Sequence, residues 1–169
     1  MKALRICLAG IFAVTLSGQA QPRDVDGWGK IHWGMTLAEA SQAYVIDRHE
    51  DNDYWSQLIA QPVIVGDITM RVSIAAKHGS TQVSRVRLST NVAGRNAEDD
   101  FDTLKTQLIQ KYGPPIDGET RTEGTNAVRT FLWTFPSTSI RLTVTPGQNS
   151  QGRIEVEYNA TDKNALDLL

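Results

Sequence analysis

The chain has 169 residues, the size of one ordinary domain, with 17 basic and 19 acidic side chains and a formal net charge of −2. This acidic balance argues against bulk affinity for nucleic acid, so we expect no nucleic-acid partner. The only cysteine, Cys7, lies close to the N-terminus, so neither an internal disulfide nor a thiolate metal site is expected.

Residues 1–20 have the layout of a secretory signal peptide. Lys2 and Arg5 give a positive start, an apolar run follows over residues 6–16, and the small residues Ser17-Gly18-Gln19-Ala20 come next. We predict cleavage after Ala20 and a periplasmic or secreted product. A buried N-terminal strand or helix is the alternative, and the apolar run is too short for a stable membrane span.

The predicted mature chain, residues 21–169, is interpreted as a single α+β domain with a net charge of −4. A chain of this size can bury roughly 70% of its unfolded surface, which is enough for a hydrophobic core. Because the mature chain has no cysteine, no covalent cross-link is expected to add to its stability.

A first helix is predicted to begin after Thr36. The Thr36 side chain can accept from the backbone of Glu39 while the Glu39 carboxylate accepts from the backbone of Thr36, which is the reciprocal pattern of a capping box. Four residues then share one helical face: Leu37, Ala40, Ser41 and Tyr44.

The charged segment 47–53 is predicted to be a solvated loop. Asp51 and Asp53 suggest a calcium loop, and His49 beside acids suggests a metal ligand. However, the glycine and the downstream glutamate of an EF-hand are missing from their required positions. The sequence therefore predicts no metal site and no cofactor.

Alternating apolar residues predict a hairpin in the middle of the chain. Residues 63–65 and 68–77 flank the turn Gly66-Asp67. In the second arm apolar side chains recur at every second residue, which gives one buried and one exposed face. The next strand directs Val86 and Leu88 inward.

A second helix is predicted over residues 97–112. Asn96 is the expected N-cap, acidic residues crowd the first turn and Lys111 lies near the end, as the helix dipole favours. Gly113 ends the helix, and Pro114-Pro115 prevents its continuation.

The last third of the chain reads as a polar loop over residues 117–125 and three strands over 127–135, 139–145 and 153–158. In the first of these strands Phe131 and Trp133 share a face with Phe135. We assign this face to the core because the threonines on the opposite face match the polar faces of the neighbouring strands.

The predicted order is a helix and three strands, twice, in repeat units of about residues 31–90 and 96–158. Antiparallel hairpins with two helices on one face of the sheet make a two-layer α+β domain. The other face of such a sheet stays uncovered.

Two stretches carry a resemblance to known families: Gly34-Met35-Thr36 with Glu39, and Leu108 with Tyr112-Gly113-Pro114-Pro115 before a run of strands. In a small exported chain, two such units resemble the tandem architecture of the β-lactamase inhibitor proteins. A single unit is similar to the small barrel-assembly lipoproteins of the outer membrane. The resemblance implies a bacterial envelope module that binds another protein without catalysis.

The sequence contains none of the common catalytic motifs. Three histidines fall in separate predicted loops or edges: His32, His49 and His78. Ser80 lies two residues from His78, which is too little to nominate a nucleophile and its base. Glu155 and Glu157 share a strand face, as an acid–base pair would, but alternating charge is common on open sheets. No catalytic residue is predicted, and a small hydrolase remains the third hypothesis.

The leading hypothesis is a non-catalytic module that binds another envelope protein as an inhibitor or assembly factor. Its predicted partner-binding residues are five arginines on the uncovered face of the sheet: Arg71, Arg85, Arg87, Arg141 and Arg153. Arginine is enriched at the energetic centres of interfaces. The alternative is a solvated face on which these arginines pair with Glu155 and Glu157.

The second hypothesis is a small-ligand carrier with a pocket between the helices and the sheet. The residues predicted to line this pocket are Trp33, Tyr44, Phe101 and Trp133. Aromatic side chains of this kind serve a core as well as a pocket, so the two uses are left open here.

Overall fold

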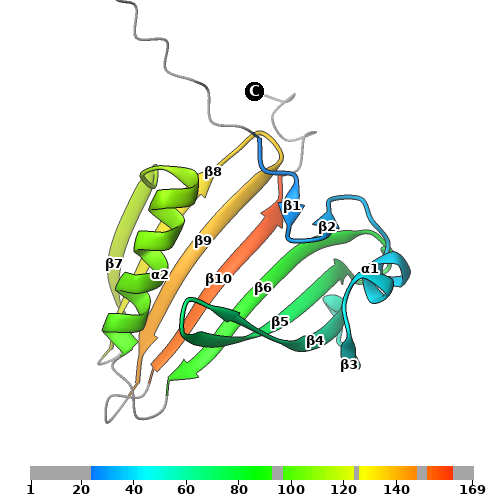
Figure 1. Cartoon of the computed structure of the whole chain (residues 1–169), viewed down its shortest axis with the longest axis horizontal. Helices are drawn as coiled ribbons and strands as arrows, with labels where there is room; N and C mark the ends of the chain where they lie inside the picture. Colours follow the sequence, from blue (N-terminus) through cyan, green and yellow to red (C-terminus); the bar gives the residue numbers. More distant parts are fainter. Residues whose placement is uncertain (1–23, 93–96, 124–125, 148–151, 162–169) are drawn as a thin grey trace, which may run out of the picture.

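The computed structural model describes residues 24–92, 97–123, 126–147 and 152–161. Figure 1 shows their arrangement: one large antiparallel sheet, two helices, and a small two-stranded sheet of β1 (Gly27–Trp28) and β2 (Ile31–His32). The predicted signal peptide and the predicted N-cap Asn96 lie outside the described residues.

The large sheet has eight strands in the order β3-β4-β5-β6-β10-β9-β8-β7. The strands between the two helices are β3 (Ile46–Asp51), β4 (Trp55–Val65), β5 (Ile68–Lys77) and β6 (Val83–Val92). Those after the second helix are β7 (Asp117–Glu123), β8 (Asn126–Thr134), β9 (Thr138–Pro146) and β10 (Gly152–Ala160). The two halves therefore meet in the middle of the sheet, where their last strands, β6 and β10, pair.

Both predicted helices are present. α1 (Leu37–Ala43) begins with the predicted capping box: the Glu39 N–H donates to Thr36 Oγ1 at 3.2 Å and the Thr36 N–H donates to Glu39 Oε2 at 2.8 Å. These bonds from the backbone and side chain of Thr36 lower the pKa of Glu39. α2 (Ala97–Tyr112) ends at Gly113, whose φ of 84° is the left-handed conformation that glycine adopts most readily.

Each helix is followed by four strands, so the predicted three strands per helix are wrong. The charged segment predicted as a loop over 47–53 lies mostly in β3, and the polar segment 117–125 lies mostly in β7. Both strands are edges of the sheet, where charged side chains are common and apolar alternation is lacking. β4 also begins at Trp55, before the predicted start of the hairpin.

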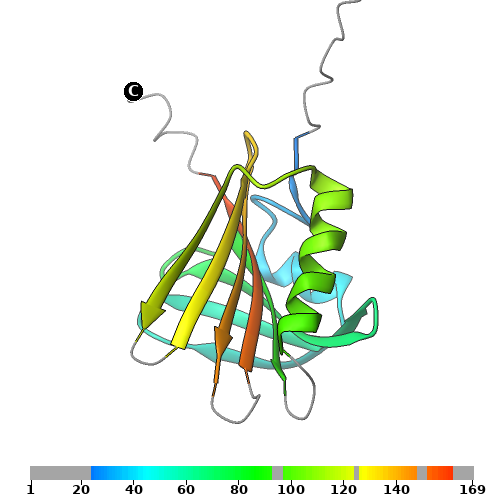
Figure 2. The same cartoon turned by 90° about the vertical axis from the view of Figure 1, so that its left-hand side faces the viewer.

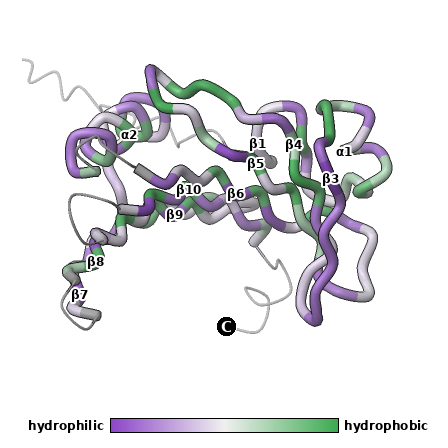
Figure 3. Tube along the Cα trace, turned by 90° about the horizontal axis from the view of Figure 1, so that it is seen from below, coloured by the Kyte–Doolittle hydropathy of each residue, from purple (hydrophilic) through white to green (hydrophobic). Residues whose placement is uncertain are grey.

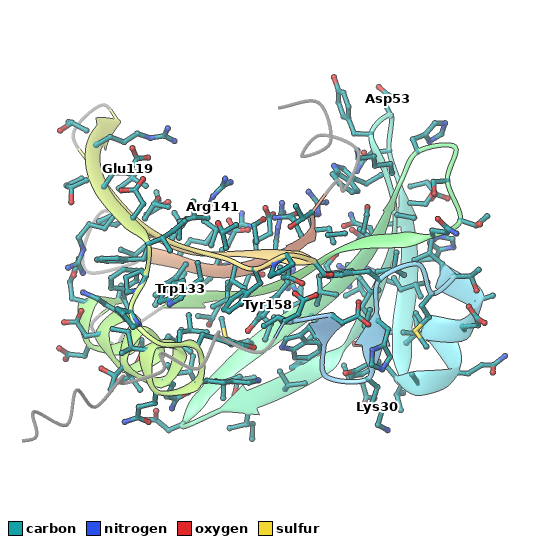
Figure 4. The ribbon with its side chains drawn as sticks, turned by 90° about the horizontal axis from the view of Figure 1, so that it is seen from above. Lys30, Asp53, Glu119, Trp133, Arg141 and Tyr158 are labelled. Carbon is teal, nitrogen blue, oxygen red and sulfur yellow. The ribbon has the colours of Figure 1, made fainter. Side chains whose placement is uncertain are left out.

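The sheet is curved, and its helices cover the convex face. Figures 3 and 4 show both ends of the sheet bending away from α2, so that the opposite face is concave. We call these the convex and concave faces. The core lies on the convex face, where inward residues of the central strands are fully buried: Val72, Ile74, Ile140, Leu142 and Ile154.

The hairpin of β4 and β5 closes the space between the two helices. In Figure 2 its tip reaches toward one end of α2. Gly66 at this tip has a φ of 66°, and a Cβ added there would lie 2.7 Å from Gln107 Nε2 of α2. The positive φ favours glycine here, whereas the flexible Gln107 side chain could move aside for a Cβ.

The predicted α+β class with an antiparallel sheet is confirmed, although strand residues far outnumber helical ones. Trp133 is 1% exposed and Phe135 6% exposed, as assigned from the alternation. Among the described residues, neither helix has the length and apolar character needed to cross a membrane.

Candidate functional site: the concave face

The alternation of the strands determines which side chains reach the concave face. In β5 the apolar residues from Ile68 onward face the core, so Arg71 faces the opposite way. The registers carry the same face across the sheet: Arg71 lies opposite Ser89, Arg87 opposite Glu157, and Glu157 opposite Arg141. Figure 4 shows Arg141 on the concave side and Trp133 and Tyr158 on the side of α2.

All five predicted arginines therefore lie on the concave face. Three of them belong to one ion-paired group with two glutamates, which we call the arginine–glutamate cluster: Arg85, Arg87, Arg153, Glu155 and Glu157. The pairing with these glutamates that sequence reasoning offered as the alternative holds for these three arginines.

Arg87 is the centre of the cluster. Its Nε lies 2.9 Å from Glu155 Oε1, and its Nη2 donates to Glu157 Oε2 at 3.0 Å. Arg153 Nε lies 3.0 Å from the other oxygen of Glu155. The planar guanidinium of Arg87 can bridge both carboxylates because its donors point in fixed directions. The cluster is therefore held in one geometry before any partner binds.

Glu157 is the most enclosed acid of the cluster, with 18% of its side chain exposed. Burial raises the pKa of Glu157, but hydrogen bonds from Asn159 and Arg87, together with the charges of Arg87 and Arg85, outweigh burial and lower the pKa below its ordinary value. Its carboxylate thus stays ionised and holds the arginines in place.

Arg85 is held by an aromatic ring as well as by an acid. Its side chain is 11% exposed, its Nη1 lies 3.9 Å from Glu157 Oε2, and its guanidinium carbon lies 3.6 Å from the centroid of the Trp55 ring. Burial, and then the charge of Arg87, lower the pKa of Arg85 against the pull of Glu157 and Glu155. The group stays cationic because an arginine does not deprotonate in proteins.

A separate polar chain runs from β5 to the edge at β3. Ser73 Oγ donates to Gln57 Oε1 at 2.8 Å, and Gln57 Nε2 donates to Glu50 Oε2 at 3.2 Å. Arg48 in turn pairs with Glu50. The concave face thus carries two groups of linked side chains, this one from β5 to β3 and the arginine–glutamate cluster on β6 and β10.

Arg71 and Arg141 differ from the other three arginines. Both are exposed, and neither makes an ion pair with any residue in the described ranges. They lie on opposite sides of the arginine–glutamate cluster, on β5 and β9. Their donors are therefore available to an incoming group.

The central strands of the concave face carry a net positive charge. On the five strands β4, β5, β6, β10 and β9, the described residues that face this side include six basic and two acidic side chains, whereas the whole chain is acidic. The six basic residues are Arg71, Lys77, Arg85, Arg87, Arg141 and Arg153. Beyond them β7 directs Asp117, Glu119 and Arg121 to this side, and Figure 4 shows Glu119 at that end.

The four residues predicted to line a ligand pocket are not brought together. Trp33 Nε1 donates to Thr138 Oγ1 at 2.6 Å, and Tyr44 stacks on Trp28 with the ring centroids 5.8 Å apart. Phe101 is fully buried, and Trp133 Nε1 donates to the carbonyl of Gly113 at 2.8 Å. Each ring fills its own part of the convex side.

The histidines form no catalytic pair in the described part of the chain. Ser80 Oγ accepts from the Gln82 N–H at 3.1 Å, and no hydrogen bond joins it to His78. His32 and His49 lie beside the exposed acids Asp26 and Asp51 at 3.7 and 3.5 Å. Within the described residues, no group of three or more histidine, cysteine or acidic side chains is placed to hold a metal ion.

Sequence reasoning missed Trp55, the aromatic platform under Arg85. The residue follows the charged segment of the β3–β4 hairpin and lies outside the strands predicted from the sequence. The run Trp55 to Ala60 does carry a strand signal, since an aromatic and β-branched or apolar residues occur within six positions.

Comparison of the chain with models of protein families, with curated proteins and with solved structures finds no match to any of them.

Proposed function

We propose that this chain is a non-catalytic binding module that recognises an acidic surface of another protein with its concave face. One observation supports the proposal above the others: the open face of the sheet carries six basic and two acidic side chains on its central strands, in a chain that is acidic overall. Opposite charge on a partner would speed association and favour one orientation.

The arginine–glutamate cluster gives this face a fixed shape. Arg87 and Glu157 are already paired, so they lose little side-chain entropy when a partner binds. Arg71 and Arg141 flank the cluster with unpaired guanidinium groups, and arginine at such positions is a common energetic centre of interfaces. We therefore assign partner capture to Arg71 and Arg141, and the positioning of the surface to the cluster.

The setting that we propose is the bacterial cell envelope. The support comes from the layout of residues 1–20, which predicts export and cleavage after Ala20. An inhibitor or an assembly factor is the kind of protein that such a binding face suits, because both act by occupying a partner's surface.

The test is affinity capture from a periplasmic extract with the exported chain as bait. Charge reversal of the two unpaired arginines, Arg71→Glu with Arg141→Glu, should abolish capture and leave the fold intact by circular dichroism. Reversal of Arg85 and Arg87 would be a poorer test, because it places new acids beside Glu157.

The matched control reverses two exposed lysines on the convex side, Lys30→Glu with Lys111→Glu. This variant changes the net charge by the same amount, and Figure 4 shows Lys30 on the side away from Arg141. Equal capture by wild type and by the Arg71/Arg141 variant would refute the proposal. Equal loss in both variants would show that net charge alone drives the interaction, which also refutes it.

A small-ligand carrier is the second candidate, and one observation favours it. A hollow of about 200 Å³ lies between α2 and the sheet, with Leu104 and Leu108 on one side and Met70, Leu88 and Val156 on the other. Trp28 lines its edge, so its fluorescence should report occupancy. A saturable change in this fluorescence on addition of a small apolar compound that does not itself fluoresce, such as cyclohexanol, lost in Leu104→Phe, would support this function.

A further inference from the structure

The concave face ends in a hollow of about 420 Å³, with a lining of mixed polar and apolar character, at the site where β6 changes its neighbour. β10 pairs with β6 only as far as Asn159 opposite Arg85. Beyond that point the segment before α1 takes its place, with the Val83 N–H donating to the Met35 carbonyl at 2.7 Å. The two neighbours of β6 diverge here, and the hollow lies between them.

The lining of this hollow favours a ligand that accepts hydrogen bonds. Six polar side chains line it: Lys77, Ser80, Gln82, Ser84, Asn159 and Thr161. Trp55, the ring under Arg85, forms part of its wall. None of the described lining residues is acidic, and Lys77 supplies a positive charge. A carboxylate fits this set because it has acceptors only and is attracted by the cation.

Two hydroxyl groups at the hollow lack partners. Ser84 Oγ and Thr161 Oγ1 are buried and make no hydrogen bond with any described residue. Buried hydroxyls are usually satisfied, so an unsatisfied pair on the wall of one hollow is informative. Both oxygen atoms are covered in the structure, so each has to rotate about its Cα–Cβ bond to reach a group bound in the hollow.

The backbone at Ser84 is built to turn that residue out of the regular ladder. The register between β5 and β6 pairs Ala75 with Arg85 and Ala76 with Val83, which leaves Ser84 as the extra residue of a bulge. Bulges re-aim side chains and are frequent beside functional sites. The bulge and the unsatisfied hydroxyls are independent observations at the same place.

We infer that this hollow binds a carboxylate group of the partner polypeptide, either an acidic side chain or a chain terminus. Lys77 pairs with the carboxylate. The hydroxyl groups of Ser84 and Thr161 donate hydrogen bonds to it, and Trp55 packs against the carbon atoms that carry it. This inference rests on the proposed function, since it names one anchoring point of the acidic partner.

The experiment is an NMR titration of the ¹⁵N-labelled predicted mature chain, residues 21–169, with four small probes. N-acetyl-glutamate α-amide carries only a side-chain carboxylate, and N-acetyl-glycine carries only a terminal one. N-acetyl-glutamine amide is the neutral match, and methyl glucoside tests a saccharide. We expect saturable shifts of the Trp55 indole and of the Lys77, Ser84 and Thr161 amides with a carboxylate probe alone. The acid that binds more tightly identifies the source of the carboxylate.

Substitutions in the lining test whether the carboxylate probe binds in the hollow. Ser84→Ala and Thr161→Val remove the hydroxyls with little change of shape, and each should weaken binding of the carboxylate probe roughly ten- to a hundredfold, as expected for a lost hydrogen bond to a charged group. Lys77→Gln, at an exposed position, should weaken it similarly without affecting folding. Thr145→Val, on the same face but outside the hollow, should leave the affinity unchanged.

Several results would overturn the inference: no saturable shift with either acid, equal shifts with the neutral amide, binding of methyl glucoside alone, or affinity unchanged in all three hollow variants. These failures are distinct from failure of the proposed function, because Arg71 and Arg141 lie outside the hollow. Capture that depends on those two arginines would then stand without a carboxylate anchor.

Discussion

On the convex face, alternate residues of β5, β9 and β10 are mostly apolar and are covered, whereas on the concave face most of the residues between them are charged or polar. Val156 and Glu157 are neighbours in the chain, yet one packs under α2 and the other pairs with Arg87. The convex face stabilises the fold through area removed from water, and the concave face contributes mainly orientation. Substitutions on the two faces should therefore have different consequences, and the following five experiments test this from the largest expected effect to the smallest.

The largest effect is expected from Trp133→Ala on the convex face. The ring is 1% exposed and its N–H donates to the Gly113 carbonyl, so the change leaves a cavity and an unpaired carbonyl at the end of α2. The free energy of unfolding should fall by about 3–5 kcal/mol, measured by urea denaturation. A loss no larger than that of the concave-face variants below would contradict the claim that the convex face contributes more to stability.

Glu157→Gln should have the largest effect on the concave face. It leaves Arg85 and Arg87 without their shared carboxylate, and we expect a loss of about 1–3 kcal/mol at neutral pH. Leu142→Ala, a buried position on the convex face of the neighbouring strand, is the reference and should cost more.

Glu157→Gln should also change the pH dependence of the free energy of unfolding. Because the pKa of Glu157 is lowered on folding, its contribution is fully present above the unfolded pKa of about 4.3 and is lost as the pH falls through the folded pKa. The difference in unfolding free energy between wild type and Glu157→Gln should therefore shrink on acidification below about pH 5. A difference that is constant with pH would contradict this role.

Trp55→Leu should have a smaller effect. It removes the aromatic face under Arg85 but keeps an apolar side chain at a half-buried position. We expect a loss of about 0.5–1 kcal/mol in thermal or urea unfolding. The stability of a Trp55→Phe variant, which keeps a ring, should lie between those of wild type and Trp55→Leu.

The smallest effect on stability is expected from Arg71→Gln with Arg141→Gln. Neither side chain has an ion-pair partner among the described residues, so the unfolding free energy should change by less than about 0.5 kcal/mol. If capture of the partner is lost at the same time, binding and stability reside on separate faces. A clear loss of stability would show that these arginines support the fold.

The parts of the fold that could be predicted are those with a strong local signal. The capping box at Thr36, the end of α2 at Gly113 and the alternation in β5 each depend on residues close together in the sequence. The inward assignment of Trp133 followed from the threonines opposite it. These signals are local, so one sequence is enough to read them.

The edge strands could not be predicted in the same way. β3 and β7 are polar on both sides, because neither is flanked by strands on both edges, and their sequences resemble loops. The candidate site was predicted in part: alternation placed the five arginines on one face, but not which of them find an acid. The bulge at Ser84 and the change of neighbour at β6 depend on tertiary pairing, which local patterns do not carry.

The central pairing of β6 with β10 also bears on how the chain folds. Arg87 and Glu157 are 70 residues apart along the chain, whereas the other pairings of the large sheet join strands that are consecutive in sequence. Closing so long a segment carries a higher entropic cost than forming a hairpin. The two four-stranded meanders should thus acquire amide-exchange protection early, and the seam that unites them should be the last part of the sheet to become protected.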